Sequence, residues 1–288
     1  MKDLNYQLMK LCRANRDGSF STQATRKSIL NRIANQLHEL GYKHMQAKSL
    51  KPKHVEALVS LWKDQNLSVG TLKNLLSGLR WWAKHVGKSD IIPKDNDAFD
   101  IGKRSQVAKE SKAWELKEAQ LEKISDPYVR LSLRLQAAFG LRREEAIKFR
   151  PNYAVKDDHI KLKDSWTKGG RARTVPILSD EQRSLLNEVK AFAKGGALIP
   201  ANKNYEKQLH RYERQVRDAG IKNPHGLRHA YAQQRFEELT GFKSPLAGGP
   251  NRSALSKEER ALDEKARAVI SKELGHDRTA ITRTYLGR

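Results

Sequence analysis

The stretch HIKLKDSWTKGGRARTVPI, residues 159–177, decides the fold class because the helical pattern of the surrounding chain changes there. Two short strand-like runs lie in it, at residues 159–162 and 172–177. Between them Lys168 precedes two glycines, and glycine is a residue that tight turns favour. The stretch therefore predicts an antiparallel β-hairpin with Lys168 at its tip, within a chain that is otherwise helical.

Apolar residues recur at helical spacing on both sides of the hairpin. The helices expected in this half of the chain cover residues 116–124, 127–139, 180–192, 205–219, 225–239, 257–273 and 279–285. The segment 240–256 is rich in Gly and Pro and is expected to be a loop. The second domain is thus predicted to be mixed and mostly helical, with a small antiparallel sheet.

The N-terminal third predicts a separate helical domain. Apolar residues follow a helical pattern over 21–40, Pro52 is placed to open a second helix, and Ser68 is placed to cap a third. From 88 to 112 the pattern fades into polar and charged residues, which is typical of an extended linker. These features predict one domain at 1–107 and another at 108–288.

The charge balance indicates a polyanionic partner. The 288 residues include 56 Lys and Arg against 33 Asp and Glu, a formal net charge of +23. Nucleic acid is the leading partner because neutralising phosphates releases counterions; a membrane surface is the weaker alternative. Lys73, Arg80 and Lys84 form one basic helix face that is expected to meet DNA, unless it is only the solvated face of a plain bundle.

Other function classes are disfavoured. Cys12 is the only cysteine, so neither an internal disulfide nor a cysteine-based zinc site is expected. No apolar run is long enough to span a bilayer, and the first residues do not read as a signal peptide. We therefore expect a cytoplasmic protein without membrane contact.

Four polar stretches in the second domain stand out. They are GLRREEAIKF at 140–149 with Arg142, the hairpin with Lys168, HGLRHAYAQ at 225–233 with His225 and Arg228, and the closing ELGHDRTAITRTYLGR at 273–288 with His276 and Tyr285. Arginine suits planar, two-pronged phosphate contacts. Two arginines, a lysine and two histidines would surround one phosphodiester, and a tyrosine beside it could attack the phosphorus.

Each residue alone has a simpler interpretation. Arg142 fits a surface charge, Lys168 an ordinary turn residue and His225 a helix cap, while Tyr285 fits a buried anchor for a terminal helix. Motifs this short also arise by chance. Their joint order favours the phosphate pocket.

In these four stretches the sequence resembles the tyrosine recombinases, which include the phage integrases. The family motif Gly-Leu-Arg-x-x-Glu matches residues 140–145, and the hairpin lysine matches Lys168. The motif His-x-Leu-Arg-His matches 225–229, and Leu-Gly-His followed by tyrosine matches 274–276 and Tyr285. The resemblance covers essentially the whole chain. It implies a helical core-binding (SAM-like) domain, a linker and a catalytic domain.

The resemblance implies strand cleavage and rejoining through a 3′-phosphotyrosine, without metal, ATP or another cofactor. Arg142 and Arg228 would bind the phosphate oxygens, His276 would donate to them, and Lys168 would protonate the leaving 5′ oxygen. His225 would exchange a proton near Tyr285, the nucleophile. In supporting roles, Glu145 would orient Arg142 and His229 would be structural.

The resemblance also implies partners: double-stranded recombination sites, a homotetramer on DNA formed from free monomers, and an accessory directionality factor. We expect a nucleoid-associated protein of a mobile element. Two departures from the family are a longer segment at 240–262, which would contact DNA or a neighbouring subunit, and a very short stretch after Tyr285. A type IB topoisomerase and a non-catalytic DNA-binding relative remain the alternatives.

Overall fold

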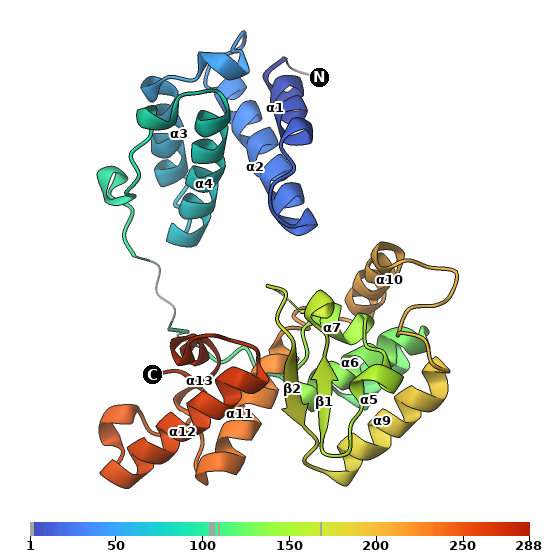
Figure 1. Cartoon of the computed structure of the whole chain (residues 1–288). Coiled ribbons are helices and arrows are strands. Elements are labelled where there is room, and N and C mark those ends of the chain that lie inside the picture. The colour runs from blue at the N-terminus through green and yellow to red at the C-terminus, as the bar shows by residue number, and fades with distance from the viewer. Residues whose placement is uncertain (1–2, 104–106, 109, 168) are drawn as a thin grey trace. The chain divides into compact units, whose positions relative to one another are not determined.

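The computed structural model describes residues 3–103, 107–108, 110–167 and 169–288. The chain divides into two compact units, Met1–Ser105 and Gln106–Arg288 (Figure 1). Each unit has its own apolar core, and the fold is mainly helical, as predicted. In the part of the chain that the structure describes, no helix is long and apolar enough to cross a membrane.

Four helices form the first unit. They are α1 (Asp3–Ala14), α2 (Phe20–Glu39), α3 (Pro52–Asp64) and α4 (Val69–His85). Pro52 opens α3 and the hydroxyl of Ser68 accepts from the third residue of α4, as the sequence predicts. Trp62 and Trp82 are completely buried, and each indole N–H finds an acceptor inside the core. The core therefore forms without leaving these polar atoms unpaired.

The prediction of an extended linker from residue 88 is wrong for its first half. Two 3₁₀ turns, η2 (Ser89–Ile91) and η3 (Asp97–Phe99), occupy it, and Ile92 and Ile101 are buried in the first core. These isolated apolar residues are too far apart to give a periodic signal, but each fills a place in the core. The first unit therefore extends well beyond α4.

The second unit surrounds a two-stranded antiparallel sheet of β1 (His159–Leu162) and β2 (Arg173–Pro176), with Ile160 opposite Val175. The predicted strands are confirmed, although β2 is shorter than expected. The turn between them is longer than a tight hairpin turn because η4 (Asp164–Trp166) precedes the glycines and buries Trp166. Gly169 and Gly170 both have positive φ, which glycine adopts without strain.

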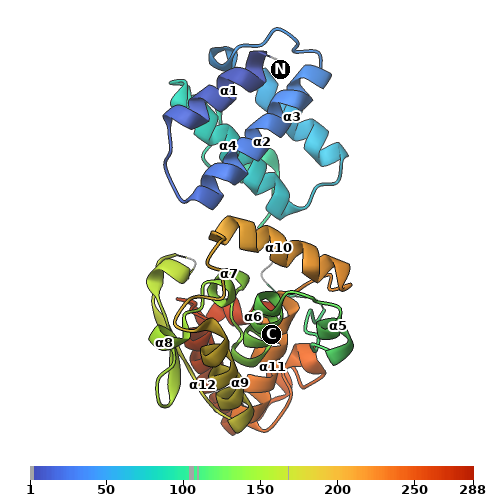
Figure 2. The ribbon, with the colours of Figure 1, turned by 90° about the vertical axis from the view of Figure 1, so that its right-hand side faces the viewer.

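Helices make up most of the second unit. They are α5 (Glu118–Glu122), α6 (Pro127–Phe139), α7 (Arg143–Ile147), α8 (Pro151–Ala154), α9 (Asp180–Ala193), α10 (Tyr205–Asp218), α11 (Gly226–Thr240) and α12 (Lys257–Glu273). Figure 2 shows α10 close to α6 and α7. The buried amide of Gln136 donates to the Tyr212 hydroxyl at 2.8 Å, and this bond fixes α10 to α6.

The chain closes with η7 (Thr279–Thr282) and α13 (Arg283–Leu286), where one helix was expected. The predicted loop after α11 contains two 3₁₀ turns, η5 (Pro245–Ala247) and η6 (Arg252–Ala254). A Cβ added at Gly287 would lie 3.0 Å from Pro245 and 3.2 Å from Leu246. The long segment therefore packs on the end of its own chain.

Candidate active site

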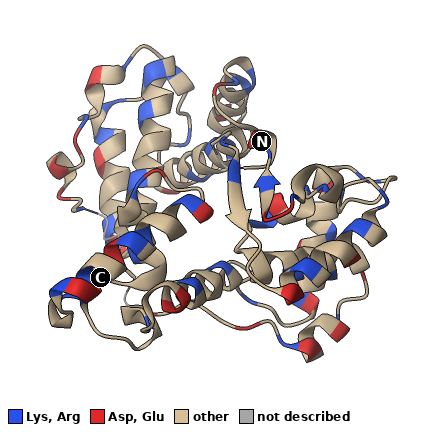
Figure 3. Ribbon diagram, turned by 60° about the horizontal axis from the view of Figure 1, so that its bottom comes forward, with Lys and Arg blue, Asp and Glu red and all other residues tan. Residues whose placement is uncertain are grey.

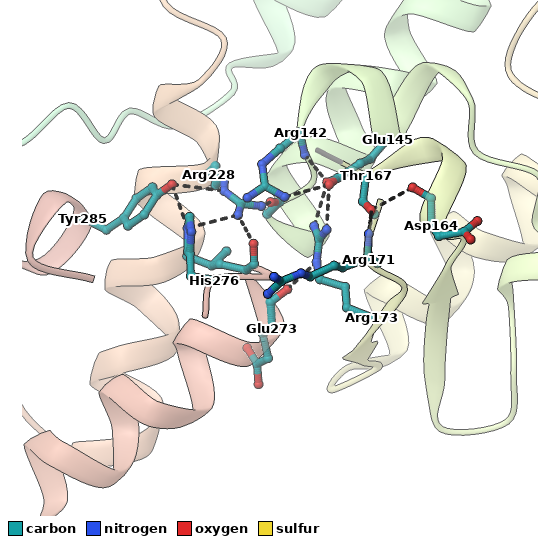
Figure 4. Close-up of polar contacts among 12 residues, drawn as sticks. Arg142, Glu145, Asp164, Thr167, Arg171, Arg173, Arg228, Glu273, His276 and Tyr285 are labelled. Carbon is teal, nitrogen blue, oxygen red and sulfur yellow. Dashed lines mark hydrogen bonds and ion pairs between the residues drawn. The ribbon is translucent and has the colours of Figure 1, made fainter. Parts of the chain in front are cut away.

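The predicted site residues come from the ends of four elements of the second unit. Arg142 precedes α7, Arg228 lies in the first turn of α11, His276 follows α12, and Tyr285 lies in α13. Figure 4 shows these four side chains gathered in one place. Residues separated by up to half of the chain thus meet around a single point.

The hydroxyl of Tyr285 lies between two of these groups. It is 3.4 Å from Nε of Arg228 and 3.3 Å from Nε2 of His276 (Figure 4). The rings of His225 and His229 lie 6.2 and 4.6 Å from the Tyr285 ring, centroid to centroid. Tyr285 is only 4% exposed, so its hydroxyl is held inside the site rather than in solvent.

Arg228 connects three of the sequence motifs. It is 1% exposed, and its two η nitrogens donate to the carbonyls of Gly140 and Leu274. Burial lowers the pKa of Arg228 to about 10, with Arg142 and Arg173 acting in the same direction, against the opposing effects of Tyr285 and Glu145. The guanidinium therefore remains charged at neutral pH. This buried cation is available to an anion that reaches the tyrosine.

Glu145 is a completely buried carboxylate between two arginines. It accepts from Nη1 and from the backbone N–H of Arg142, at 2.9 and 2.6 Å, and from both η nitrogens of Arg173 at 2.6 Å. Burial alone would raise the pKa of Glu145, but the hydrogen bonds and charge of Arg173, with Arg228 and Arg142, lower it to about 2. Glu145 is thus an anion that fixes the arginines in place.

Arg173 is a further residue of the site that the sequence motifs did not predict. Its Nε also donates to the backbone carbonyl of Glu273 at 2.8 Å, one turn before His276. The signal that could have found Arg173 is strand alternation, since Arg173 shares a face with the buried Val175. An arginine on the inner face of a strand needs a buried partner.

The pKa values of the three histidines of the site are lowered. Burial, and then the charges of Arg228 and Arg142, lower the pKa of His276 to about 3. Burial and His225 lower the pKa of His229 to about 4, and burial and Arg228 lower that of His225. After burial, the positive charges of Arg228 and Arg142 are the largest effects that lower the pKa of His276. An anion bound beside these arginines would offset their charge and raise the pKa of His276 again.

Comparison with known proteins places this arrangement in a family. A phage integrase N-terminal model matches residues 1–92, and an integrase model matches residues 101–234. The chain belongs to the tyrosine recombinases. It is therefore a site-specific DNA recombinase, an enzyme that cuts and rejoins DNA strands. The integrase match includes Arg142, His225 and Arg228, whereas His276 and Tyr285 lie beyond it and join the site through the geometry above.

Solved structures share the recombinase fold at low sequence identity. The XerH site-specific recombinase in a post-cleavage complex is 19% identical, with 98% of this chain and 80% of that chain covered, at a TM-score of 0.59. A lambda integrase dimer bound to a COC′ core site is 15% identical over 99% and 77%, at 0.60. The Tn1549 transposon integrase is 15% identical over 99% and 95%, at 0.52. No curated protein matches the chain in sequence.

The hairpin reaches the site through Arg173, the first residue of β2. Lys168 lies outside the described residues. Beside it the hydroxyl of Thr167 accepts from the backbone N–H of Arg171 at 2.9 Å (Figure 4). The side chain of Arg171 pairs with Asp277, next to His276. Among the described residues, no group of three His, Cys, Asp or Glu side chains is arranged to hold a metal ion.

The predicted DNA-facing residues of α4 differ in their surroundings. Figure 3 shows Lys and Arg on helices of both units. Lys84 is exposed and Lys73 is half-buried. The guanidinium of Arg80 instead donates to the backbone carbonyl of Pro93 at 2.8 and 3.0 Å, which ties the segment after α4 to that helix. Arg80 therefore has a structural partner within the first unit.

Proposed function

We propose that this recombinase cuts DNA by attack of the Tyr285 hydroxyl on a backbone phosphorus. The bond from phosphorus to the 5′ oxygen breaks, and a 3′-phosphotyrosine forms. A 5′-hydroxyl of another strand then attacks that phosphorus and releases the tyrosine. The observation that carries the proposal is the position of the Tyr285 hydroxyl, between the cation of Arg228 and the imidazole of His276.

In this proposal, Arg142 and Arg228 bind the non-bridging oxygens on which negative charge develops. Glu145 and Arg173 hold Arg142 in place through the ion pairs described above. Lys168 protonates the leaving 5′ oxygen. Arg142 and Arg228 occupy fixed positions before the reaction, so they need little reorganisation when the charge appears.

The proton of Tyr285 goes to a histidine. Nη2 of Arg228, which can only donate, lies 3.5 Å from Nε2 of His276. This contact favours the tautomer in which Nε2 is the acceptor, so Tyr285 donates to it. A bound phosphodiester raises the pKa of His276 by offsetting the arginine charges, which makes His276 a better base when substrate is present. His225 lies at the exposed side of the site and serves as a second proton carrier, while His229 packs against the tyrosine ring.

The DNA partner and the assembly are proposed from the relatives. Structures similar to this chain include XerH bound to a palindromic difH substrate and a lambda integrase tetramer bound to a Holliday junction. We therefore propose that residues 1–107 bind the core site and residues 108–288 carry the chemistry. Free monomers form a homotetramer on paired sites, with an accessory directionality factor. The similar integrases of a phage and a transposon favour a mobile element, acting at the nucleoid.

Replacing Tyr285 with phenylalanine tests the nucleophile. The substrate is a nicked suicide duplex, selected by sequencing DNA fragments that become covalently trapped on the wild-type protein. Wild-type protein should form a covalent adduct on a denaturing gel, and Tyr285→Phe should bind the same duplex without forming one. The control is Tyr6→Phe, the same change at an exposed tyrosine of the first unit. An adduct formed by the Tyr285 variant would show that another residue is the nucleophile.

A further inference from the structure

The segment that follows the boundary between the two units is fixed to the start of α11. The indole N–H of Trp114 donates to the backbone carbonyl of Asn223 at 2.6 Å. A Cβ added at Gly226 would lie 2.2 Å from the Trp114 ring and 2.3 Å from the Lys112 carbonyl. Only glycine allows so close an approach, so residues 111–114 and the first turn of α11 form one packed piece.

Ser111 in this segment is connected to the tyrosine through Gln233 of α11. Nε2 of Gln233 donates to the backbone carbonyl of Tyr285 at 3.0 Å and to the Ser111 hydroxyl at 2.9 Å. The Ser111 hydroxyl lies 3.3 Å from Oε1 of the same amide. A backbone carbonyl can only accept, so the NH₂ end of Gln233 must face Tyr285. All of these contacts join parts of the second unit.

We propose that Gln233 is a positioning residue for Tyr285, and that Ser111 holds the Gln233 amide in the required orientation. Tyr285 lies in α13, a helix of four residues, so its backbone depends on contacts from outside that helix. Its hydroxyl contacts, at 3.3 and 3.4 Å, are long, so a small shift of the backbone would break them. The end of the interdomain connection thereby contributes to the placement of the nucleophile. This inference rests on the proposed role of Tyr285.

The test measures single-turnover formation of the covalent adduct at saturating suicide DNA. Gln233→Met keeps the length of the side chain but removes both hydrogen-bonding ends, and it should slow adduct formation roughly two- to tenfold, the worth of one neutral hydrogen bond. Gln233→Glu can still accept from Ser111 but cannot donate to Tyr285, so it should be at least as slow. The DNA dissociation constant should stay unchanged in both. The control is Gln234→Met, because Gln234 bonds to Glu238 instead.

Ser111→Ala should slow adduct formation less than Gln233→Met, and the double variant should be no slower than Gln233→Met alone, because Ser111 acts through the amide. A duplex with a bridging 5′-sulfur, whose leaving group needs no acid, should not restore the Gln233→Met rate. That result would distinguish misplacement of the nucleophile, Tyr285, from loss of the acid that protonates the leaving oxygen.

Several outcomes would overturn the inference. They are a wild-type adduct rate in Gln233→Glu, a loss in Gln233→Met that appears only as weaker DNA binding, or full rescue by the sulfur substrate. Failure of the proposed function would look different, since wild-type protein would then form no adduct at Tyr285.

Discussion

Arg173 holds the carboxylate of Glu145 with both η nitrogens, each at 2.6 Å, while its Nε binds the backbone carbonyl of Glu273 at 2.8 Å. This one side chain joins β2, α7 and the end of α12. Arg142 lies directly before α7, His276 follows the end of α12, and the hairpin of Lys168 leads into β2. The geometry of the site therefore depends on Arg173.

Replacing Arg173 with glutamine should destabilise the protein by about 3–5 kcal/mol, because a buried carboxylate loses its two-pronged partner. Arg173→Lys should recover little of this, since one ammonium cannot replace the guanidinium fork. Urea unfolding would measure both. The control is Arg171→Gln, which removes an exposed pair with Asp277 and should cost at most about 1 kcal/mol. Equal losses at 171 and 173 would contradict this role.

Stability should fall in mild acid. The folded-state pKa of His229 is lowered to about 4 from its ordinary 6.5. The unfolded chain therefore binds more protons between these values, and the free energy of unfolding drops as pH falls through that window, by up to about 1.4 kcal/mol per pH unit. The pKa of Glu145 is also lowered, from 4.5 to about 2, so the free energy of unfolding falls further as the pH drops below about 4.5.

Urea titrations at a series of pH values between about 7 and 5 would measure this slope. His229→Gln should reduce this slope by the share of one histidine, while His276, whose pKa is also lowered, keeps its own share; His210→Gln, at an exposed position, is the control. Identical slopes in the wild type and His229→Gln would refute the linkage.

The basic residues of α4 should separate into two groups. Lys84→Gln should weaken DNA binding at all sequences and reduce the salt slope by about one, as loss of a phosphate contact does. Lys73→Gln should act in the same way. Arg80→Gln should instead lower thermal stability, because the Pro93 carbonyl loses its donor. Fluorescence anisotropy over a salt series and thermal melts would decide, and a purely electrostatic effect at Arg80 would contradict the structural role.

Cleavage should persist in excess EDTA without ATP, because side-chain cations carry the charge stabilisation in the proposed mechanism. Adduct formation by dialysed protein, with and without added magnesium, provides the comparison. Activity lost in EDTA and restored by magnesium would overturn that mechanism.

Assembly should require DNA. Light scattering should find a monomer in free protein and a tetramer only with paired sites. Deleting residues 247–253 leaves Pro245 and Leu246, which contact Gly287, in the chain. The deletion should therefore spare single-site binding and weaken synapsis. A tetramer without DNA, or unchanged synapsis after the deletion, would show that this segment does not serve assembly.

Local features of the chain were predictable from the sequence. Pro52 starts α3 through its fixed φ, Ser68 starts α4 by accepting from the next turn, and β1 begins and ends where its strand pattern does. The four motifs were visible because each is contiguous. Their grouping followed from resemblance rather than from any local rule, since Arg142 and Tyr285 share no stretch of chain.

Only the tertiary structure decided which distant side chains meet. Arg173 reaches Glu145 across 28 positions and Glu273 across 100, and Ser111 reaches Gln233 across 122. Burial of Ile92 and Ile101 likewise depends on the core that surrounds them. Helix caps and strand alternation depend on residues only a few positions apart, so the local sequence is enough to predict them. The partner of a buried charge is set by packing, because the low-dielectric interior makes an unpaired charge costly wherever in the sequence its partner lies.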